Sequence, residues 1–269
     1  MKWELLASPR FGTIDRNIPV VLNIAAIEQH GPHLPVATDA MIGRHFTERI
    51  DAQLADQVLV LPQLAVCCSR HHMDFPGTLT VRHETFLAYL TDLLGSVAAH
   101  GFRNLVLFNS HGGNLAIAQV VVEAFGNDHP EIELFMLTWW KIAALELAVI
   151  KESGFGGVGH ACEFETSLMQ LIAPELVQLD KAVDQLPVHD FEWAQADMLE
   201  GGFATHHRTM HQLTGGCGVS GCPSFASAEK GRRISDAVTA RAVAMLRDIA
   251  SIERARPRGE HDQLRSLSV

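Results

Sequence analysis

The sequence predicts an α/β protein in which a mainly parallel sheet lies between two layers of helices. Short runs of continuous apolar, often β-branched residues have the character of strands buried on both faces of a parallel sheet. These runs alternate with longer segments of helical period, and short polar turns separate the two. Such alternation is typical of βαβ units, because neighbouring parallel strands need a long crossover connection. We therefore expect a three-layer α/β/α sandwich that forms one domain over residues 1–269.

The apolar runs place four strands, at residues 18–26, 58–64, 105–109 and 132–137. Helical periods are found at residues 38–54, 84–99, 115–125, 163–172 and 226–252. Gly101 follows the second of these helices, at the position where a left-handed residue commonly ends a helix. Residues 181–224 show no regular period, and we predict an irregular segment there.

The composition excludes several classes of protein. The chain has 269 residues, 47% of them hydrophobic, so it can bury a large core and is neither collagen-like nor disordered. Its 21 basic and 31 acidic residues give a formal net charge of −10, which disfavours a surface that follows nucleic-acid phosphates. Histidine is unusually frequent, with 15 residues, and imidazole is a common metal ligand and proton carrier.

The cysteines and the N-terminal residues give further expectations. Five cysteines form an odd set without the spacing of a disulfide framework or a zinc finger. The first residues lack an apolar core of signal-peptide length, and no run reaches the ~20 apolar residues of a membrane span. We therefore expect a cytoplasmic protein without nucleic-acid or membrane partners.

Carboxylates and imidazoles gather after the predicted strands, where open α/β sheets bind their ligands. Glu28 and His30 follow the first strand, and Asp39 opens the next helix. His111 follows the third strand, and His160 precedes a further helix. The sequence therefore directs these side chains to one edge of the sheet.

Spacing gives two of these segments the character of a metal site. Residues two apart in extended chain face the same way, so Glu28 and His30 can address one cavity. His160 and Glu163 would share a helical face. Oxygen donors mixed with imidazole suit zinc, manganese or iron better than a thiolate-preferring ion.

Each of these residues also has a structural interpretation. Asp39 can serve as a helix cap, which is the better reading of that residue taken alone. His111 can be a hydrogen-bonded turn residue, while Glu163 and Glu165 can be first-turn acids favoured by the helix dipole. Of the adjacent histidines 71 and 72, we expect one to face solvent. The coincidence of four loops with ligand-type residues favours the metal site.

Several motifs resemble the creatininase (creatinine amidohydrolase) family. They occur in the family's order and span nearly the whole chain. The matching blocks are Glu28-Gln29-His30-Gly31-Pro32-His33-Leu34-Pro35 with Thr38-Asp39, Phe75-Pro76-Gly77-Thr78, Asn109-x-His111-Gly112-Gly113-Asn114, Gly159-His160-Ala161-x-Glu163-x-Glu165-Thr166-Ser167, Gly218-Val219-x-Gly221-x-Pro223 and Ala228-Glu229-Lys230-Gly231-Arg232.

The resemblance implies a creatininase-like α/β/α sandwich, a homo-oligomer, often a hexamer, and two divalent ions per subunit. Zinc is the first expectation, with manganese or iron as alternatives. By resemblance, Glu28 and His111 would bind one ion and His30 the other, with Asp39 bridging both. Creatininase has a ligating Glu at the place of Gly113, and we assign that role here to Glu163. This departure puts creatinine in question as the substrate, since the family also contains formamidopyrimidine deformylases, a mycofactocin peptidase and keto-inositol hydrolases.

We accordingly expect a metal-dependent amidohydrolase that cleaves a C–N bond of a small cyclic amide or formamide through a hydroxide bridging the two ions. His160 would shuttle the proton to the leaving nitrogen. Free N–H groups around Gly112 and Gly113 could hold an anionic part of the substrate. Trp139 and Trp140 could line the substrate pocket or simply pack. The alternatives are hydrolysis of another bond in a ring substrate, such as a keto-inositol or lactone, and a non-catalytic metal-binding subunit.

Overall fold

The computed structural model describes residues 1–252, so residues 253–269 of the predicted domain lie outside the described residues. Its sheet has four parallel strands in the order β2-β1-β3-β4. All four predicted strands are confirmed, although the second forms only two ladder residues before Pro62, which has no N–H to donate. The strand bounds are β1 Val20–Ile24, β2 Leu59–Val60, β3 Asn104–Asn109 and β4 Glu133–Thr138.

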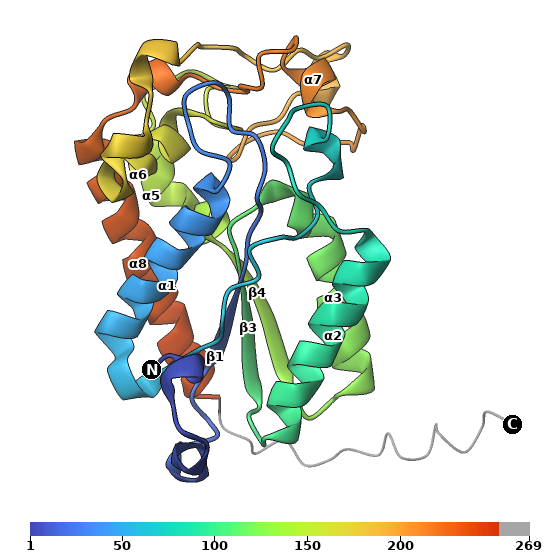
Figure 1. The fold of residues 1–269 in the computed structure, drawn as a ribbon, viewed down its shortest axis with the longest axis vertical. Coiled ribbons are helices and arrows are strands. Elements are labelled where there is room, and N and C mark those ends of the chain that lie inside the picture. Colours follow the sequence, from blue (N-terminus) through green and yellow to red (C-terminus); the bar gives the residue numbers. More distant parts are fainter. Residues whose placement is uncertain (253–269) are drawn as a thin grey trace, which may run out of the picture.

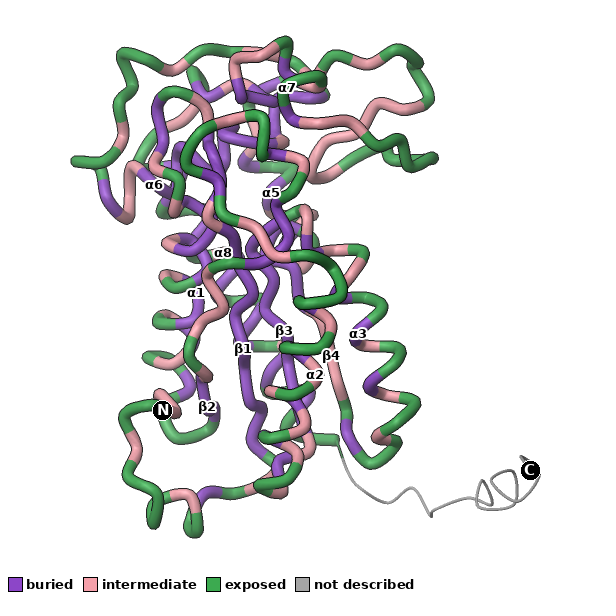
Figure 2. Tube along the Cα trace, turned by 45° about the vertical axis from the view of Figure 1, so that its right-hand side comes forward, coloured by how far each residue is buried: buried purple, intermediate pink, exposed green. Residues whose placement is uncertain are grey.

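Helices cover both faces of this sheet, as the alternation of apolar runs predicted (Figure 1). One face carries α1 (Thr38–Leu54), α6 (Glu163–Ile172) and α8 (Ala228–Ala250), together with the short α4 (Trp139–Ile142) and α5 (Ala144–Ile150). The other face carries α2 (His83–Ala99) and α3 (Leu115–Asp128). Figure 2 shows buried strands in the middle and exposed outer surfaces on these helices. The three-layer sandwich is therefore confirmed.

Two cores result from the alternation of side chains along the strands. Val21 of β1 packs into the core beneath α1, α6 and α8, whereas its neighbour Leu22 packs into the core beneath α2 and α3. All five residues of β1 are buried, as expected of a strand covered on both faces. None of the helices within residues 1–252 has the length and hydropathy needed to cross a membrane.

The loops that follow the strands meet at one end of the sheet, at the top of Figure 1. The segment predicted as irregular lies over this end and contains the single-turn helix α7 (Met210–Leu213). Strand order reverses between β1 and β3, which is where open α/β sheets bind their ligands. The topology alone therefore predicts a ligand site at the carboxyl ends of β1 and β3.

Close packing holds the start of α1 over the end of β1. A Cβ at Gly43 would lie 2.2 Å from Asn23 Oδ1 and 2.6 Å from Ser110 Oγ. The buried Asn23 side chain also donates to the Phe108 carbonyl oxygen at 2.8 Å. Helix α1 therefore rests on the ends of β1 and β3, and its first turn is carried to the carboxyl edge of the sheet.

Candidate metal centre

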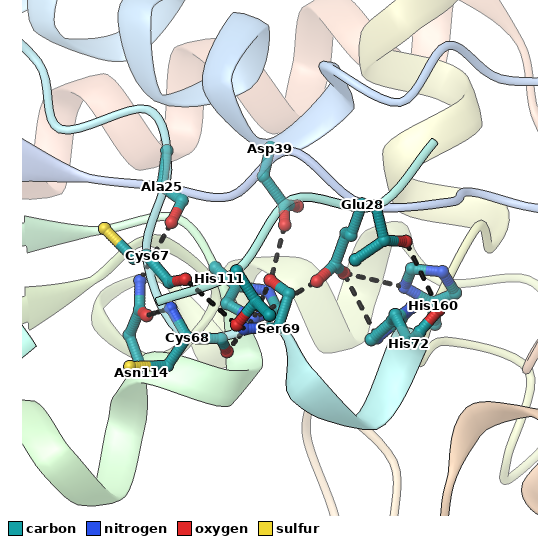
Figure 3. Close-up of polar contacts among 12 residues, drawn as sticks. Ala25, Glu28, Asp39, Cys67, Cys68, Ser69, His72, His111, Asn114 and His160 are labelled. Carbon is teal, nitrogen blue, oxygen red and sulfur yellow. Dashed lines mark hydrogen bonds and ion pairs between the residues drawn. The ribbon is translucent and has the colours of Figure 1, made fainter. Parts of the chain in front are cut away.

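Five buried side chains from four segments converge above β1 and β3. Glu28 and His30 come from the loop after β1, and Asp39 comes from the first turn of α1. His111 follows β3, and Glu165 lies in the first turn of α6. None of the five is more than 4% exposed. Figure 3 shows Glu28, Asp39 and His111 pointing toward one another.

Backbone contacts fix the orientation of His111. Its Nε2 lies 3.0 Å from the Cys68 carbonyl oxygen, so we place the ring proton on Nε2. Nδ1 then presents its lone pair to Asp39 Oδ2, 2.9 Å away. Glu28 Oε2 lies 3.2 Å from Nε2 of the same ring. An imidazole lone pair facing a carboxylate oxygen is stable only when a cation or a proton lies between them.

His30 is oriented in the same way by its own loop. Nδ1 lies 3.1 Å from the Glu28 carbonyl oxygen, which accepts a hydrogen bond from the Nδ1–H group. Nε2 then faces Asp39 Oδ1 at 3.3 Å and Glu165 Oε1 at 3.8 Å. A backbone carbonyl that fixes the tautomer of a ligand histidine is a common arrangement around protein metal ions.

The polar atoms left without partners test whether metal ions fit this centre. Within residues 1–252, four atoms of the cluster are buried and make no hydrogen bond, namely Glu28 Oε2, His30 Nε2, Asp39 Oδ2 and Glu165 Oε2. Leaving such atoms unpaired in a protein interior is costly. Three buried carboxylates also need positive charge close by. Oxygen and imidazole donors of this kind suit zinc, manganese or iron, so the residues fit divalent ions.

The pKa values of Glu28, Asp39 and His111 also indicate that this cluster favours positive charge. Burial is the main reason that the pKa of Glu28 rises to about 7, with the nearby Asp39 adding to the rise. Burial alone would lower the pKa of His111, but Glu28 and Asp39 outweigh it and raise that pKa to about 9. The pKa of Asp39 falls despite burial, because His30 and His111 favour its charged form. The carboxylates therefore stabilise positive charge in their midst, as a cation site requires.

Glu163 does not lie in this cluster, which corrects its predicted role as a ligand. Its carboxylate accepts the N–H groups of Glu152 and Ser153, each at 2.9 Å, and pairs with the buried Lys230. Lys230 holds the pKa of Glu163 below its ordinary value although burial opposes the shift. The acid of α6 that does lie in the cluster is Glu165, whose Oε1 is 3.8 Å from His30 Nε2.

The physical reason is the point at which α6 begins. His160 lies before the helix, Ala161 is left-handed with φ +53°, and Cys162 is extended, so His160 and Glu163 do not share a helical face. Within a helix, two residues of sequence correspond to a rotation of about 200° about the axis, so their side chains point to nearly opposite sides. Glu165 therefore faces the cluster when Glu163 faces α8.

His160 lies at the centre, where the sequence placed it. Its Nε2 donates to the Gln29 carbonyl oxygen at 2.7 Å, and Nδ1 lies 3.5 Å from Glu28 Oε1. The ring packs 4.2 Å from the ring of His30, and the backbone pairs with Ser220 in a short antiparallel bridge. Burial is the main reason that its pKa falls well below the ordinary value, so the neutral ring is favoured.

His72 and Gln29 are site residues that the sequence did not identify. His72 is 1% exposed, and its Nε2 lies 3.3 Å from Glu28 Oε1. The Gln29 amide nitrogen lies 3.1 Å from His72 Nδ1 and holds the proton of that ring on Nε2. The adjacent pair of histidines was the available signal. The expectation that one of them faces solvent is not met, because His71 is only partly exposed and lies close to Glu28 and His111.

The remaining predictions concern substrate contacts. Trp139 and Trp140 are 1% and 5% exposed and pack in the core beneath α8, so the structure favours packing over a place in the pocket. A Cβ at Gly113 would lie 2.4 Å from both the Cys68 carbonyl oxygen and His111 Nε2, so no side chain fits there. Gly112 is exposed beside it. The N-cap of α1 is Ala37 and Asp39 lies in the first turn, so Asp39 is not the cap of this helix.

A doubly covered parallel sheet with a buried centre of carboxylates and imidazoles at its carboxyl edge suits the binding of catalytic metal ions. The creatininase family model, described as creatinine amidohydrolase, matches residues 4–246. This chain therefore belongs to the creatininase family and is a metal-dependent hydrolase.

Curated relatives of this chain have several activities. It is 30% identical to creatinine amidohydrolase of Pseudomonas putida over 62% of this chain and 69% of the relative. It is 29% identical to a mycofactocin precursor peptide peptidase of Mycobacterium tuberculosis over 80% of this chain and 79% of the relative. A 3-dehydro-scyllo-inosose hydrolase of Thermotoga maritima is 27% identical over 62% of this chain and 54% of that protein.

Solved structures share the fold. Creatinine amidohydrolase (creatininase) superposes with a TM-score of 0.78 at 21% identity, covering 94% of this chain and 98% of that one. The solved creatininases of similar fold include a zinc–zinc form and a manganese form.

Proposed function

We propose that this chain hydrolyses a C–N bond of a small cyclic amide or formamide at a centre of two divalent ions. Zinc is the first choice, and manganese or iron are alternatives. Glu28, His111 and Asp39 would hold one ion, and His30, Glu165 and Asp39 the other. The observation that carries this proposal is the set of four buried nitrogen and oxygen atoms in the cluster that make no hydrogen bond and could each bind a metal ion. Bound divalent ions would lower the pKa of a coordinated water and polarise the substrate carbonyl.

The residues around the ligands would supply the proton transfer. Because Nε2 of His160 donates a hydrogen bond to the Gln29 carbonyl oxygen, Nδ1 is the ring atom that faces Glu28 and the proposed ions. Neutral Nδ1 can accept the proton of the attacking water and deliver it to the leaving nitrogen. His72 contacts the same Glu28 oxygen, Oε1, as His160 does, and it would keep that carboxylate oriented.

The names of the relatives support a C–N bond. Amidohydrolase and peptidase are the names of two of the three activities reported above. Gly113 has no room for the acid that creatininase carries at this place, which disfavours creatinine itself. The inosose hydrolase keeps a second candidate open, namely hydrolysis of another bond in a ring substrate at the same ions. We also propose a homo-oligomer, supported by the exposed Leu145 and Val149 of α5.

A substrate panel before and after chelation tests the proposed function. The protein loaded with zinc or manganese should hydrolyse members of a set of cyclic amides and formamides. Chelation should abolish this activity, and returning the ion should restore it. p-Nitrophenyl phosphate should remain uncleaved, because the ion pairs of Glu28, His30 and Asp39 within residues 1–252 join carboxylates and imidazoles and include no Arg or Lys. Activity that survives complete removal of metal would refute the proposal.

A further inference from the structure

A small cavity lies directly beside the proposed metal centre. It has a volume of about 260 Å³, just below the range of about 300–1,000 Å³ for pockets that bind drug-sized molecules, so it suits a small group. His30 belongs both to the lining of this cavity and to the metal cluster, so the cavity adjoins the cluster at that side chain. The cavity is lined by Gln29, His30, Gly31, Pro32, Leu34, Val36, Phe75, Pro76 and Cys217.

The walls of this cavity are apolar. Leu34, Val36 and Phe75 supply hydrocarbon side chains, and prolines from two loops complete the surface. Apart from His30, no residue among those nine bears an ionisable charge at neutral pH. Gln29 is polar, but its Oε1 accepts the Gly31 N–H at 2.9 Å and its amide nitrogen faces His72. The cavity therefore offers a ligand van der Waals contact and few polar partners.

We infer that the substrate of the proposed hydrolase carries an uncharged apolar group beside the scissile bond, and that this cavity binds that group. The inference rests on the proposed function, because His30 must hold a metal ion for the cavity to adjoin the reacting carbonyl. Val36 and Phe75 would then determine specificity. A hydrophobic pocket gains about tenfold or more in discrimination from each well-buried carbon group, and it rejects a charged group strongly.

Hydroxamates of different size separate the cavity from the metal centre. The hydroxamate group chelates the ions of any accessible zinc hydrolase, and its substituent reports on the space beside them. With the zinc-loaded protein, calorimetry should show that benzohydroxamate binds about tenfold or more tightly than acetohydroxamate. 4-Carboxybenzohydroxamate should lose most of that advantage. Equal affinities of the benzo and aceto compounds would overturn the inference but leave the metal centre intact.

Substitutions of two cavity residues, with a valine outside the cavity as the control, test whether this cavity causes the difference in hydroxamate affinity. Val36 and Val120 are 38% and 49% exposed, and Val120 lies on α3 away from the cavity. Val36→Ser and Phe75→Ser should each weaken benzohydroxamate about fivefold or more while leaving acetohydroxamate unchanged. Val120→Ser should alter neither affinity. If Val36→Ser and Phe75→Ser leave the ratio of benzohydroxamate to acetohydroxamate affinity unchanged, this cavity does not bind the apolar group. If neither hydroxamate binds to the zinc-loaded protein, the proposed function itself is refuted.

Discussion

Asp39→Ala is expected to lose both divalent ions and to lower turnover by about a thousandfold or more. Asp39 is the carboxylate that approaches both histidine ligands, at 3.3 Å from His30 Nε2 and 2.9 Å from His111 Nδ1. Its removal takes one carboxylate ligand from each proposed ion. It also removes the negative charge that lies beside the imidazoles of His30 and His111. A bound ion contributes several kcal/mol to such a reaction, and each 1.36 kcal/mol is a factor of ten in rate. Metal analysis by mass spectrometry and steady-state kinetics measure the two effects.

His160→Gln is the matched control for this substitution. It removes the proposed proton carrier and leaves Glu28, His30, Asp39, His111 and Glu165 in place. Turnover should fall by about 10²–10⁴-fold, while the metal content stays near two ions per chain. Retention of both ions and of activity in Asp39→Ala would show that Asp39 does not bridge the ions.

Lys230→Met should destabilise the folded protein by about 3–5 kcal/mol. Lys230 is 3% exposed and pairs with Glu163, which is fully buried in α6. Loss of the ammonium group leaves the Glu163 carboxylate without a counter-charge in the core between α6 and α8, held only by two backbone N–H groups. Thermal or urea unfolding followed by circular dichroism measures the change, and the midpoint temperature should fall by about 6–20 °C.

An exposed ion pair on the same helix provides the comparison. Arg241 pairs with Glu146 near the surface, and its side chain is 49% exposed. Arg241→Met should cost less than about 1 kcal/mol, as exposed pairs usually do. Should Lys230→Met prove no more destabilising than Arg241→Met, the buried pair does not support α6 in the way described.

The fold could be predicted because its signals are local. Buried parallel strands such as β3 appear as continuous apolar runs, and α1 has the same bounds in the sequence prediction and in the structure. Helices α4 and α5 escaped prediction because each is shorter than the length over which a helical period can be recognised. Trp139 illustrates a related limit, since a large aromatic residue after a strand suits a core and a pocket equally well.

The convergence of the candidate ligands was predictable from the loops that carry them, but the choice of the acid in α6 was not. Glu28, His30, Asp39 and His111 lie where parallel strands and the start of α1 bring them, so their positions after the predicted strands were enough to expect them at one edge of the sheet. Their proposed roles as ligands came from the resemblance to the creatininase family. The choice between Glu163 and Glu165 depends on the residue at which α6 begins. That start is set by the left-handed Ala161 and by the pairing of His160 with Ser220, a contact sixty residues away that no local pattern contains.

An anomalous difference map from crystals of the zinc-loaded protein tests the central claim most directly. Our account predicts two peaks about 3.5–4 Å apart, the spacing of two-metal hydrolases. One should lie against Glu28 and His111 and the other against His30 and Glu165, with Asp39 touching both. A single peak, or a second peak held by Glu163 in place of Glu165, would contradict the account.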